Sequence, residues 1–187
     1  MEAAARIVVA DGYGALSTKQ IARVAGVSVG TLYQYFPHKE AVVEALAERQ
    51  SRAMIDAFSG ALRAVVSEQP EDLEEGVAAL VDATLAAMRV RPELTRRLLL
   101  EAPRGGGGDF DRAWRQRYTE LVRSALWQRR DRLRDGEVEL MSYVVVQGAY
   151  AIFLDAAAYR PELLQGDALR DELLHLVVRY LSPSPPG

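Results

Sequence analysis

Hydrophobic residues recur every three to four positions along most of the chain, which is the spacing that an amphipathic helix needs. A short first set ends at Gly12, as a helix often ends at glycine. A longer set runs from Val42 to Val65 and predicts one long helix after Pro37. Helical spacing continues to Leu181, so the pattern predicts an all-α protein of about nine helices.

Proline and glycine separate the later helical segments. We expect helices over residues 71–91, 93–102, 110–134 and 138–159, and a last one from Pro161 or Asp167 to Leu181. The glycine run 105–108 is too flexible for a helix interior, and we favour a plain connection over a lid that gates a ligand site. The four arginines between 129 and 134 favour a solvated helix end over a second nucleic-acid patch, because cations there stabilise the helix dipole.

Residues 17–40 carry the local signals of two short helices joined by a tight turn. Ser17 and Gln20 match a capping box, in which each side chain bonds the other residue's backbone, so a helix begins after Ser17. Gly26 stands where a left-handed residue ends a helix, and Ser28 can cap the next one. These signals predict a helix-turn-helix.

The second of these short helices has two unlike faces. Leu32 and Phe36 are four positions apart and share the inner side, while small, hydroxyl and amide side chains are left outside. Such groups suit a DNA groove, because they meet base edges and phosphates without a charge to desolvate.

The segment IARVAGVSVGTLYQYFPHKEAVVEAL, residues 21–46, resembles the signature of the TetR family of one-component transcriptional regulators. The resemblance covers about the first quarter of the chain and implies that the helix ending near Phe36 lies in the major groove. It also implies DNA contacts from six residues: Thr18, Lys19, Thr31, Tyr33, Tyr35 and Lys39. His38 replaces the small polar residue usual before the lysine, so its role is either a helix cap or a phosphate contact.

The resemblance implies two domains. Residues 1–46 form a three-helix DNA-binding domain, and residues 47–187 form a larger helical domain for effector binding and dimerisation. No flexible linker lies at the boundary near Leu46, which suits two halves that communicate. The family's first helix begins several residues earlier, often after a basic arm, so either the sequence starts late or those phosphate contacts are missing.

The composition narrows the class of protein. The chain has 187 residues, 49% of them hydrophobic and 26% charged, which describes a globular protein of one or two domains. Its net charge of -3 does not point to nucleic acid, so the DNA-binding hypothesis depends on the local motif. The absence of cysteine excludes disulfides and agrees with a cytoplasmic protein. We expect no cofactor, no metal site and no membrane partner, since no apolar run approaches about 20 residues.

Residues 26–30 spell G-x-S-x-G, the nucleophile elbow of α/β-hydrolases. That elbow needs a strand before the serine, whereas the preceding residues have helical spacing and a helical cap. The chain also has only His38 and His175 as candidate bases, and neither has an evident catalytic partner. We therefore interpret Ser28 as a helix cap and do not expect an enzyme.

The segment Val138–Tyr159 is apolar nearly all round, so its helix must be covered on most sides. A chain of this size cannot cover every face, which favours a homodimer. We expect the last two helices and their symmetry mates to form a four-helix bundle, as in the TetR family. The expected interface residues are Gly148, Ala151, Asp155, Leu173 and Val177.

The family resemblance also implies a cavity among the helices of the second domain. We expect an apolar lining with a few polar groups, suited to a small hydrophobic effector. The candidate lining residues are Met88, Trp114, Tyr118, Tyr143 and Gln147. For the aromatic residues the alternative is ordinary core packing, and for Gln147 it is a hydrogen bond across the dimer.

The sequence therefore predicts a ligand-responsive repressor that a small-molecule effector releases from a palindromic double-stranded DNA operator. Two alternatives are an enzyme or small-molecule carrier with a vestigial helix-turn-helix, and a helical adaptor that uses the same face for protein contact. Tyr33, Tyr35 and Lys39 suit phosphates better than a protein groove, so the adaptor ranks last.

Overall fold

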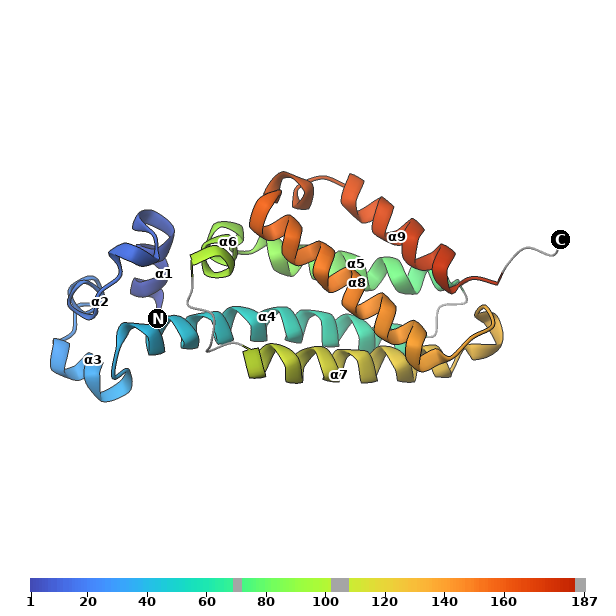
Figure 1. Ribbon diagram of the computed structural model, residues 1–187, viewed down its shortest axis with the longest axis horizontal. Helices are drawn as coiled ribbons and strands as arrows, with labels where there is room; N and C mark the ends of the chain where they lie inside the picture. The colour runs from blue at the N-terminus through green and yellow to red at the C-terminus, as the bar shows by residue number, and fades with distance from the viewer. Residues whose placement is uncertain (69–71, 102–107, 184–187) are drawn as a thin grey trace.

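The computed structural model describes residues 1–68, 72–101 and 108–183, and for residues 108–114 it describes only the backbone. Within these residues the chain forms nine α-helices and three short 3-10 helices, and it contains no strand. Figure 1 shows α1, α2 and α3 gathered at one end of an elongated molecule, with the larger helical bundle at the other. The predicted all-α fold is confirmed.

The N-terminal bundle contains α1 (Glu2–Asp11), the 3-10 helix η1 (Tyr13–Ala15), α2 (Thr18–Ala25) and α3 (Val29–Tyr35). Ser17 Oγ accepts a hydrogen bond from Gln20 N at 3.2 Å, and Ser28 Oγ accepts one from Thr31 N at 2.9 Å. Gly26 has φ 70° and ψ 28°, the left-handed conformation predicted for it. Each short helix therefore begins at a side-chain cap, and α2 ends at the expected glycine.

One half of the predicted capping box is wrong. The side-chain amide of Gln20 donates to Asp11 Oδ2 at 3.4 Å, so it bonds the end of α1 and not the backbone of Ser17. The role of His38 is also resolved, because Ala41 N donates to His38 Nδ1 at 3.1 Å. His38 therefore caps the first turn of the long helix that follows.

Helix α4 (Lys39–Glu68) is the long helix predicted after Pro37, and it runs from the N-terminal bundle through the rest of the molecule (Figure 1). Near its start, Val42, Val43 and Leu46 are buried in the N-terminal core. Further along, α4 packs against a second core formed by the C-terminal helices. One rigid element thus belongs to both cores.

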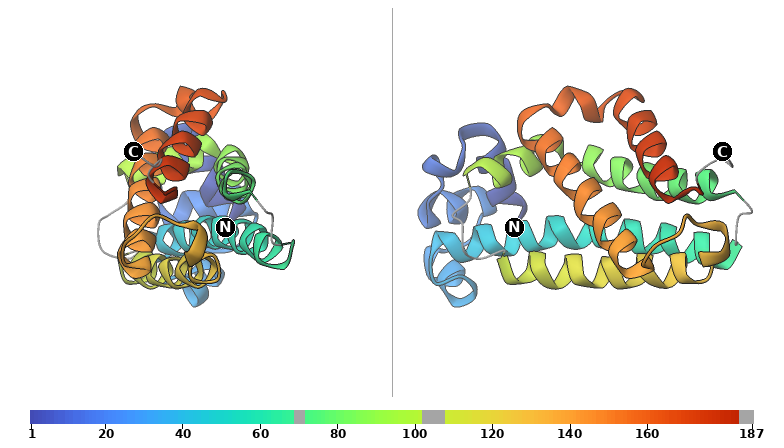
Figure 2. Two further views of the ribbon diagram at one scale, coloured as in Figure 1. Left: turned by 90° about the vertical axis from the view of Figure 1, so that its right-hand side faces the viewer. Right: turned by 45° about the vertical axis from the view of Figure 1, so that its right-hand side comes forward.

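The second core is built from α5 (Leu73–Arg89), α7 (Gly108–Trp127), α8 (Val138–Tyr159) and α9 (Ala168–Leu181), with α4 alongside. The turned views in Figure 2 show α7 running beside α4 and α8 crossing over both. Between α8 and α9 lies the 3-10 helix η3 (Pro161–Leu164), whose Leu164 is buried. The bounds of α8 are those that its apolar run predicted.

The arginines between 129 and 134 do not form one helix end as predicted. Helix α7 stops at Trp127, and a 3-10 helix, η2 (Arg130–Arg132), follows. Arg129 donates to the carbonyl of Val65 at 3.4 Å, and Arg134 donates to the carbonyl of Tyr180 at 2.7 Å. These two arginines cap the ends of neighbouring helices by bonding free carbonyl groups.

Helix α8 is the one described helix that is long and apolar enough to cross a membrane, with 22 residues and a mean hydropathy of 1.4. The sequence-based statement that no apolar run approaches that length was therefore wrong. A core helix of a soluble protein passes the same test, so this property is only a weak indication. Only 28% of its most apolar window is buried inside the chain, which leaves a large part of α8 uncovered.

Helix α6 (Pro92–Glu101) joins the two cores a second time, because it contacts α1, η1 and α4 as well as α5 and α8. Its Leu94 is only 2% exposed and belongs to the N-terminal core. At the far end of α6, Glu101 Oε2 accepts a hydrogen bond from Tyr13 N at 2.7 Å. The N-terminal helices therefore complete their core with a helix from outside residues 1–46.

Gly12 makes this contact possible. Its φ of 80° and ψ of 171° lie in a region that only glycine adopts readily, and an added Cβ would lie 2.9 Å from Glu101 Oε2. We predict that Gly12→Ala lowers the free energy of unfolding by about 1–3 kcal/mol, measured by thermal and denaturant unfolding. Gly14→Ala is the matched control, since Gly14 has ordinary φ and open space around it. Equal effects of the two substitutions would contradict the assignment.

Candidate DNA-binding surface and ligand cavity

The outer face of α3 consists of uncharged polar side chains. Leu32 is buried under the helix, while Thr31, Tyr33 and Tyr35 are exposed. The hydroxyl oxygens of Ser28 and Thr31 are 2.8 Å apart, so the cap also holds the side chain of Thr31. Exposed side chains that are already oriented lose less conformational entropy when they bind.

Helix α2 adds two further candidates to this surface. Thr18 Oγ1 lies 3.2 Å from the phenol oxygen of Tyr33, so a hydrogen bond links the start of α2 to the outer face of α3. Lys19 is exposed beside it. The structure therefore places Thr18 next to Tyr33, and it leaves Lys19 and Thr31 exposed on the same two short helices.

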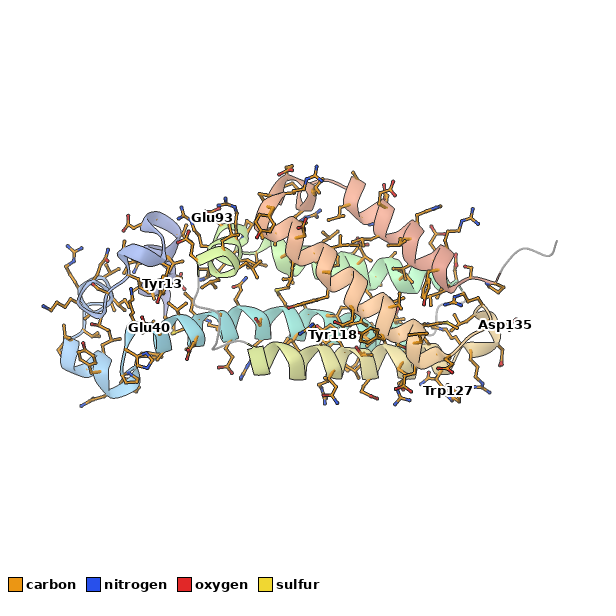
Figure 3. All side chains as sticks on the ribbon, viewed as in Figure 1. Tyr13, Glu40, Glu93, Tyr118, Trp127 and Asp135 are labelled. Atoms are coloured by element: carbon orange, nitrogen blue, oxygen red, sulfur yellow. The ribbon has the colours of Figure 1, made fainter. Side chains whose placement is uncertain are left out.

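Lys39 lies at the first residue of α4, where its ammonium is 4.6 Å from the ring centroid of Tyr13. The phenol of Tyr13 donates to Glu40 Oε1 at 3.1 Å, and Figure 3 shows Tyr13 and Glu40 side by side at the junction of the two bundles. Partial burial and this hydrogen bond raise the pKa of Tyr13. The pKa of Glu40 is lowered, first by its own backbone amide and then by the Tyr13 hydroxyl. Tyr13 thus stays a neutral phenol that packs against Lys39.

The backbone of Tyr13 is held by α6. Glu101 accepts from Tyr13 N through one oxygen, and its other oxygen accepts from Arg97 Nη1 at 2.9 Å. The Tyr13 amide and Arg97 lower the pKa of Glu101, which keeps the carboxylate charged. The Glu101–Tyr13 hydrogen bond and the packing of the Tyr13 ring on Lys39 therefore connect α6 to the start of α4.

A cavity of about 130 Å³ lies within the second core. Helices α4, α5, α7, α8 and α9 all contribute to its lining, which is almost entirely apolar. Tyr118 supplies one of the few polar groups, and its hydroxyl donates to the carbonyls of Met54 and Ile55 at 3.4 and 3.3 Å. Burial raises the pKa of Tyr118 well above its ordinary value, so the group is a neutral phenol.

The predicted lining residues do not all line the cavity. Met88 and Tyr118 line the cavity. Tyr143 is 57% exposed on the outside of α8, and Gln147 accepts a hydrogen bond from Arg115 at 3.3 Å; neither lines the cavity. These two placements were wrong because α8 is apolar on several sides, so its sequence does not indicate which side faces inward. The side chain of Trp114 and the glycines at 105–107 lie outside the described residues.

The predicted interface residues also fall into two groups. Gly148, Ala151 and Asp155 are exposed along one stripe of α8. Leu173 and Val177 are instead 2% and 7% exposed within the second core, so they are not on a surface that a partner would contact. Other large apolar side chains that are exposed on α8 and α9, and that the sequence did not suggest for the interface, include Leu140, Val144 and Leu176.

The comparisons with known proteins agree with this architecture. Residues 1–46 match the family model described as bacterial regulatory proteins, tetR family. Residues 72–181 match the model described as the tetracyclin repressor-like C-terminal domain, which by itself covers more than half of the chain. The chain belongs to the TetR family of transcriptional regulators.

Individual proteins and solved structures are similar to this chain over different extents. The nucleoid occlusion factor SlmA of Glaesserella parasuis is 31% identical over 86 residues, which span 46% of this chain and 40% of that protein. A putative TetR regulator from Shewanella sp. PV-4 has a TM-score of 0.66 at 26% identity, over 97% of this chain and 95% of that one. The SmeT–triclosan complex has a TM-score of 0.69 at 17% identity, over 100% and 96% of the two chains. The last of these shows the fold alone.

The TetR motif did not indicate several residues that the structure connects to the candidate DNA-binding surface. Tyr13 and Glu101 are 88 positions apart, and nothing local in either segment predicts their contact. The proposed contact at Lys39 depends on both, because Glu101 holds the backbone beside which Lys39 packs. Only the glycine at position 12, followed directly by a tyrosine, marked a special turn in the sequence.

Proposed function

We propose that this protein is a repressor that binds a palindromic operator through α3 and is released by a small hydrophobic effector. The observation that carries the proposal is the outer face of α3, where the hydroxyls of Thr31 and Tyr33 are exposed and hydrogen-bonded to Ser28 and Thr18. A surface of this chemistry suits the major groove. The proposal keeps the predicted domains, residues 1–46 for DNA and 47–187 for effector and dimer.

The six candidate residues fall into three groups according to their position and their chemistry. Thr31 and Lys19 are proposed to contact bases, because they lie near the start of α3 and on α2, where a helix-turn-helix meets base edges. Tyr33, Tyr35 and Lys39 are proposed to contact phosphates, since a phenol or an ammonium donates to phosphate oxygens. Thr18 holds Tyr33 in place through the 3.2 Å contact between their hydroxyl oxygens.

The phosphate assignment of Lys39 predicts a particular salt dependence. Lys39→Ala should weaken operator binding by on the order of 1 kcal/mol for all operator sequences and reduce the slope of log K against log salt by about one. Fluorescence anisotropy at several salt concentrations measures both quantities. Arg63→Ala is the control, because it removes one charge from an exposed position further along α4 and should leave the slope unchanged. An unchanged slope in Lys39→Ala would contradict the assignment.

A second copy of the chain is the proposed cover for α8 and α9. Leu140, Tyr143 and Val144 are exposed at one end of α8, and Leu176 is 54% exposed on α9. Tyr143 and Val144 lie three and four positions after Leu140 on α8, and neighbouring exposed apolar side chains of this kind mark an interaction surface. Small residues at 148 and 151 on the same face would allow two helices to approach closely.

The dimer hypothesis predicts that Gly148→Arg gives a monomer that no longer binds the palindrome. Gly148 has no atom within 4 Å of an added Cβ, so the substitution should leave the fold of a single chain intact. Sedimentation velocity measures the oligomeric state, and anisotropy measures DNA binding. The matched control is Gly60→Arg, an exposed helical glycine on α4 that also has open space around it. A Gly148→Arg protein that remained dimeric would place the interface elsewhere.

The cavity in the second core is the proposed effector site. Its lining is uncharged, so burying a charged ligand there would carry a desolvation cost that no opposite charge offsets. An apolar cavity of about 150 Å³ is large enough for a benzene-sized molecule, which sets the scale of the bound group. The structure of SmeT with triclosan supports the proposal as a case of a similar fold with a bound small molecule.

An effector at about 100 times its Kd should stabilise the protein by about 2.7 kcal/mol, which raises Tm by roughly 5–10 °C. The same compound should weaken operator binding. Ala149→Phe fills part of the cavity and should remove both effects, while Gly60→Arg should keep both. A compound that raises Tm in an Ala149-dependent way but leaves DNA binding unchanged would favour a small-molecule carrier over a repressor.

A further inference from the structure

The outer face of α3 lacks every side chain that contacts a G·C pair strongly in the major groove. Guanine is contacted by arginine or lysine, and cytosine by a carboxylate that accepts from its amino group. Helix α3 has the sequence VGTLYQY and contains no cation and no acid. The two cations of residues 17–36, Lys19 and Arg23, both belong to α2.

The side chains that α3 does expose match the other two bases. Gln34 is exposed. It follows Thr31 by three positions, so the two side chains are neighbours on one face of the helix. A glutamine amide can donate to N7 and accept from N6 of adenine at once, which makes it the matching partner for that base.

Thr31 offers a methyl group as well as a hydroxyl. Its Oγ1 lies 2.8 Å from Ser28 Oγ, and the same Ser28 oxygen accepts from Thr31 N at 2.9 Å. The hydroxyl is shared with the cap, whereas the methyl group of this exposed residue makes no hydrogen bond and is available for an apolar contact. Val27, 43% exposed in the turn just before α3, adds a second aliphatic surface. Aliphatic groups of this kind contact the C5-methyl of thymine.

Lys39 is the next cation along the chain, and it is assigned above to a phosphate. Lys39 lies at the start of α4, where its ammonium is 4.6 Å from the centre of the Tyr13 ring. Within residues 17–36, Lys19 and Arg23 on α2 are thus the cations for contacts with guanine, at positions beside those that α3 covers.

We propose that the bases that α3 contacts in each half-site are A·T pairs, with Gln34 as the adenine-specific residue and Thr31 as the residue that contacts a thymine methyl. This inference rests on the proposed operator binding. It goes further by naming the base composition of the site and the residue that determines each position. Gln34 is absent from the six DNA contacts that the family motif implied.

The experiment is selection of binding sites from random double-stranded DNA by the full-length chain and by two variants. Gln34→Ala removes the amide, and Thr31→Ser removes only the methyl and keeps the hydroxyl in the cap. Both residues are exposed, and unchanged Tm values check that the fold is preserved. We expect each variant to lose the preference at one position per half-site, an adenine for Gln34→Ala and a thymine for Thr31→Ser.

Binding to defined duplexes then quantifies the contacts. Adenine-to-guanine substitution at the position lost in Gln34→Ala should weaken the wild type about tenfold and that variant hardly at all. Replacing the thymine by uracil, which lacks only the methyl group, should weaken the wild type severalfold and Thr31→Ser hardly at all. Lys19→Ala is the control and should change preference at a different position.

The possible outcomes separate the two proposals. Two results would overturn the inference and leave operator binding intact. In the first, the variants alter the preference at G·C positions of the selected palindrome. In the second, both variants select the same palindrome as the wild type. A selection that enriches no sequence with the wild type overturns operator binding itself, and the inference with it.

Discussion

The arrangement of the two cores depends on α4, which packs into both of them. Val42, Val43 and Leu46 fix its start among the N-terminal helices, and Met54 and Phe58 pack against the second core, where they also line the cavity. From Lys39 to Phe58 the helix spans about 28 Å at 1.5 Å per residue. No proline or 3-10 segment interrupts it, so this stretch has no evident hinge between the two cores.

Helix α6 is the second connection between the two cores. Leu94 is part of the N-terminal core, and Glu101 holds the Tyr13 backbone while the Tyr13 ring packs on Lys39. The N-terminal helices are thus attached at two places, through the start of α4 and through α6. A ligand alters DNA binding only by its differential affinity for two such arrangements. If the protein responds to a ligand as proposed, the contacts between η1 and α6 are where a change in the second core would act on the proposed DNA-binding surface.

The sequence predicted best what is decided locally. The Ser28 cap, the left-handed Gly26 and the bounds of α8 depend on a few neighbouring residues, and the structure confirms them. The orientation of helices apolar on several sides could not be predicted. Leu173 was expected at a dimer interface and lies in the core, because burial on such a helix is decided by which neighbours pack against it. The Tyr13–Glu101 contact joins residues with no local signal of each other.

Helix α8 connects the two proposals that concern the second core. Val146 and Ala149 line the cavity on its inner side, while Gly148 and Ala151 lie on the exposed stripe proposed as the dimer interface. Positions one or two residues apart on one helix cannot move independently, since the helix is a rigid rod on this scale. A ligand that displaces α8 would then change the angle between two subunits. The two α3 helices need to match major grooves about 34 Å apart, so a small rotation at α8 is enough to lose one half-site.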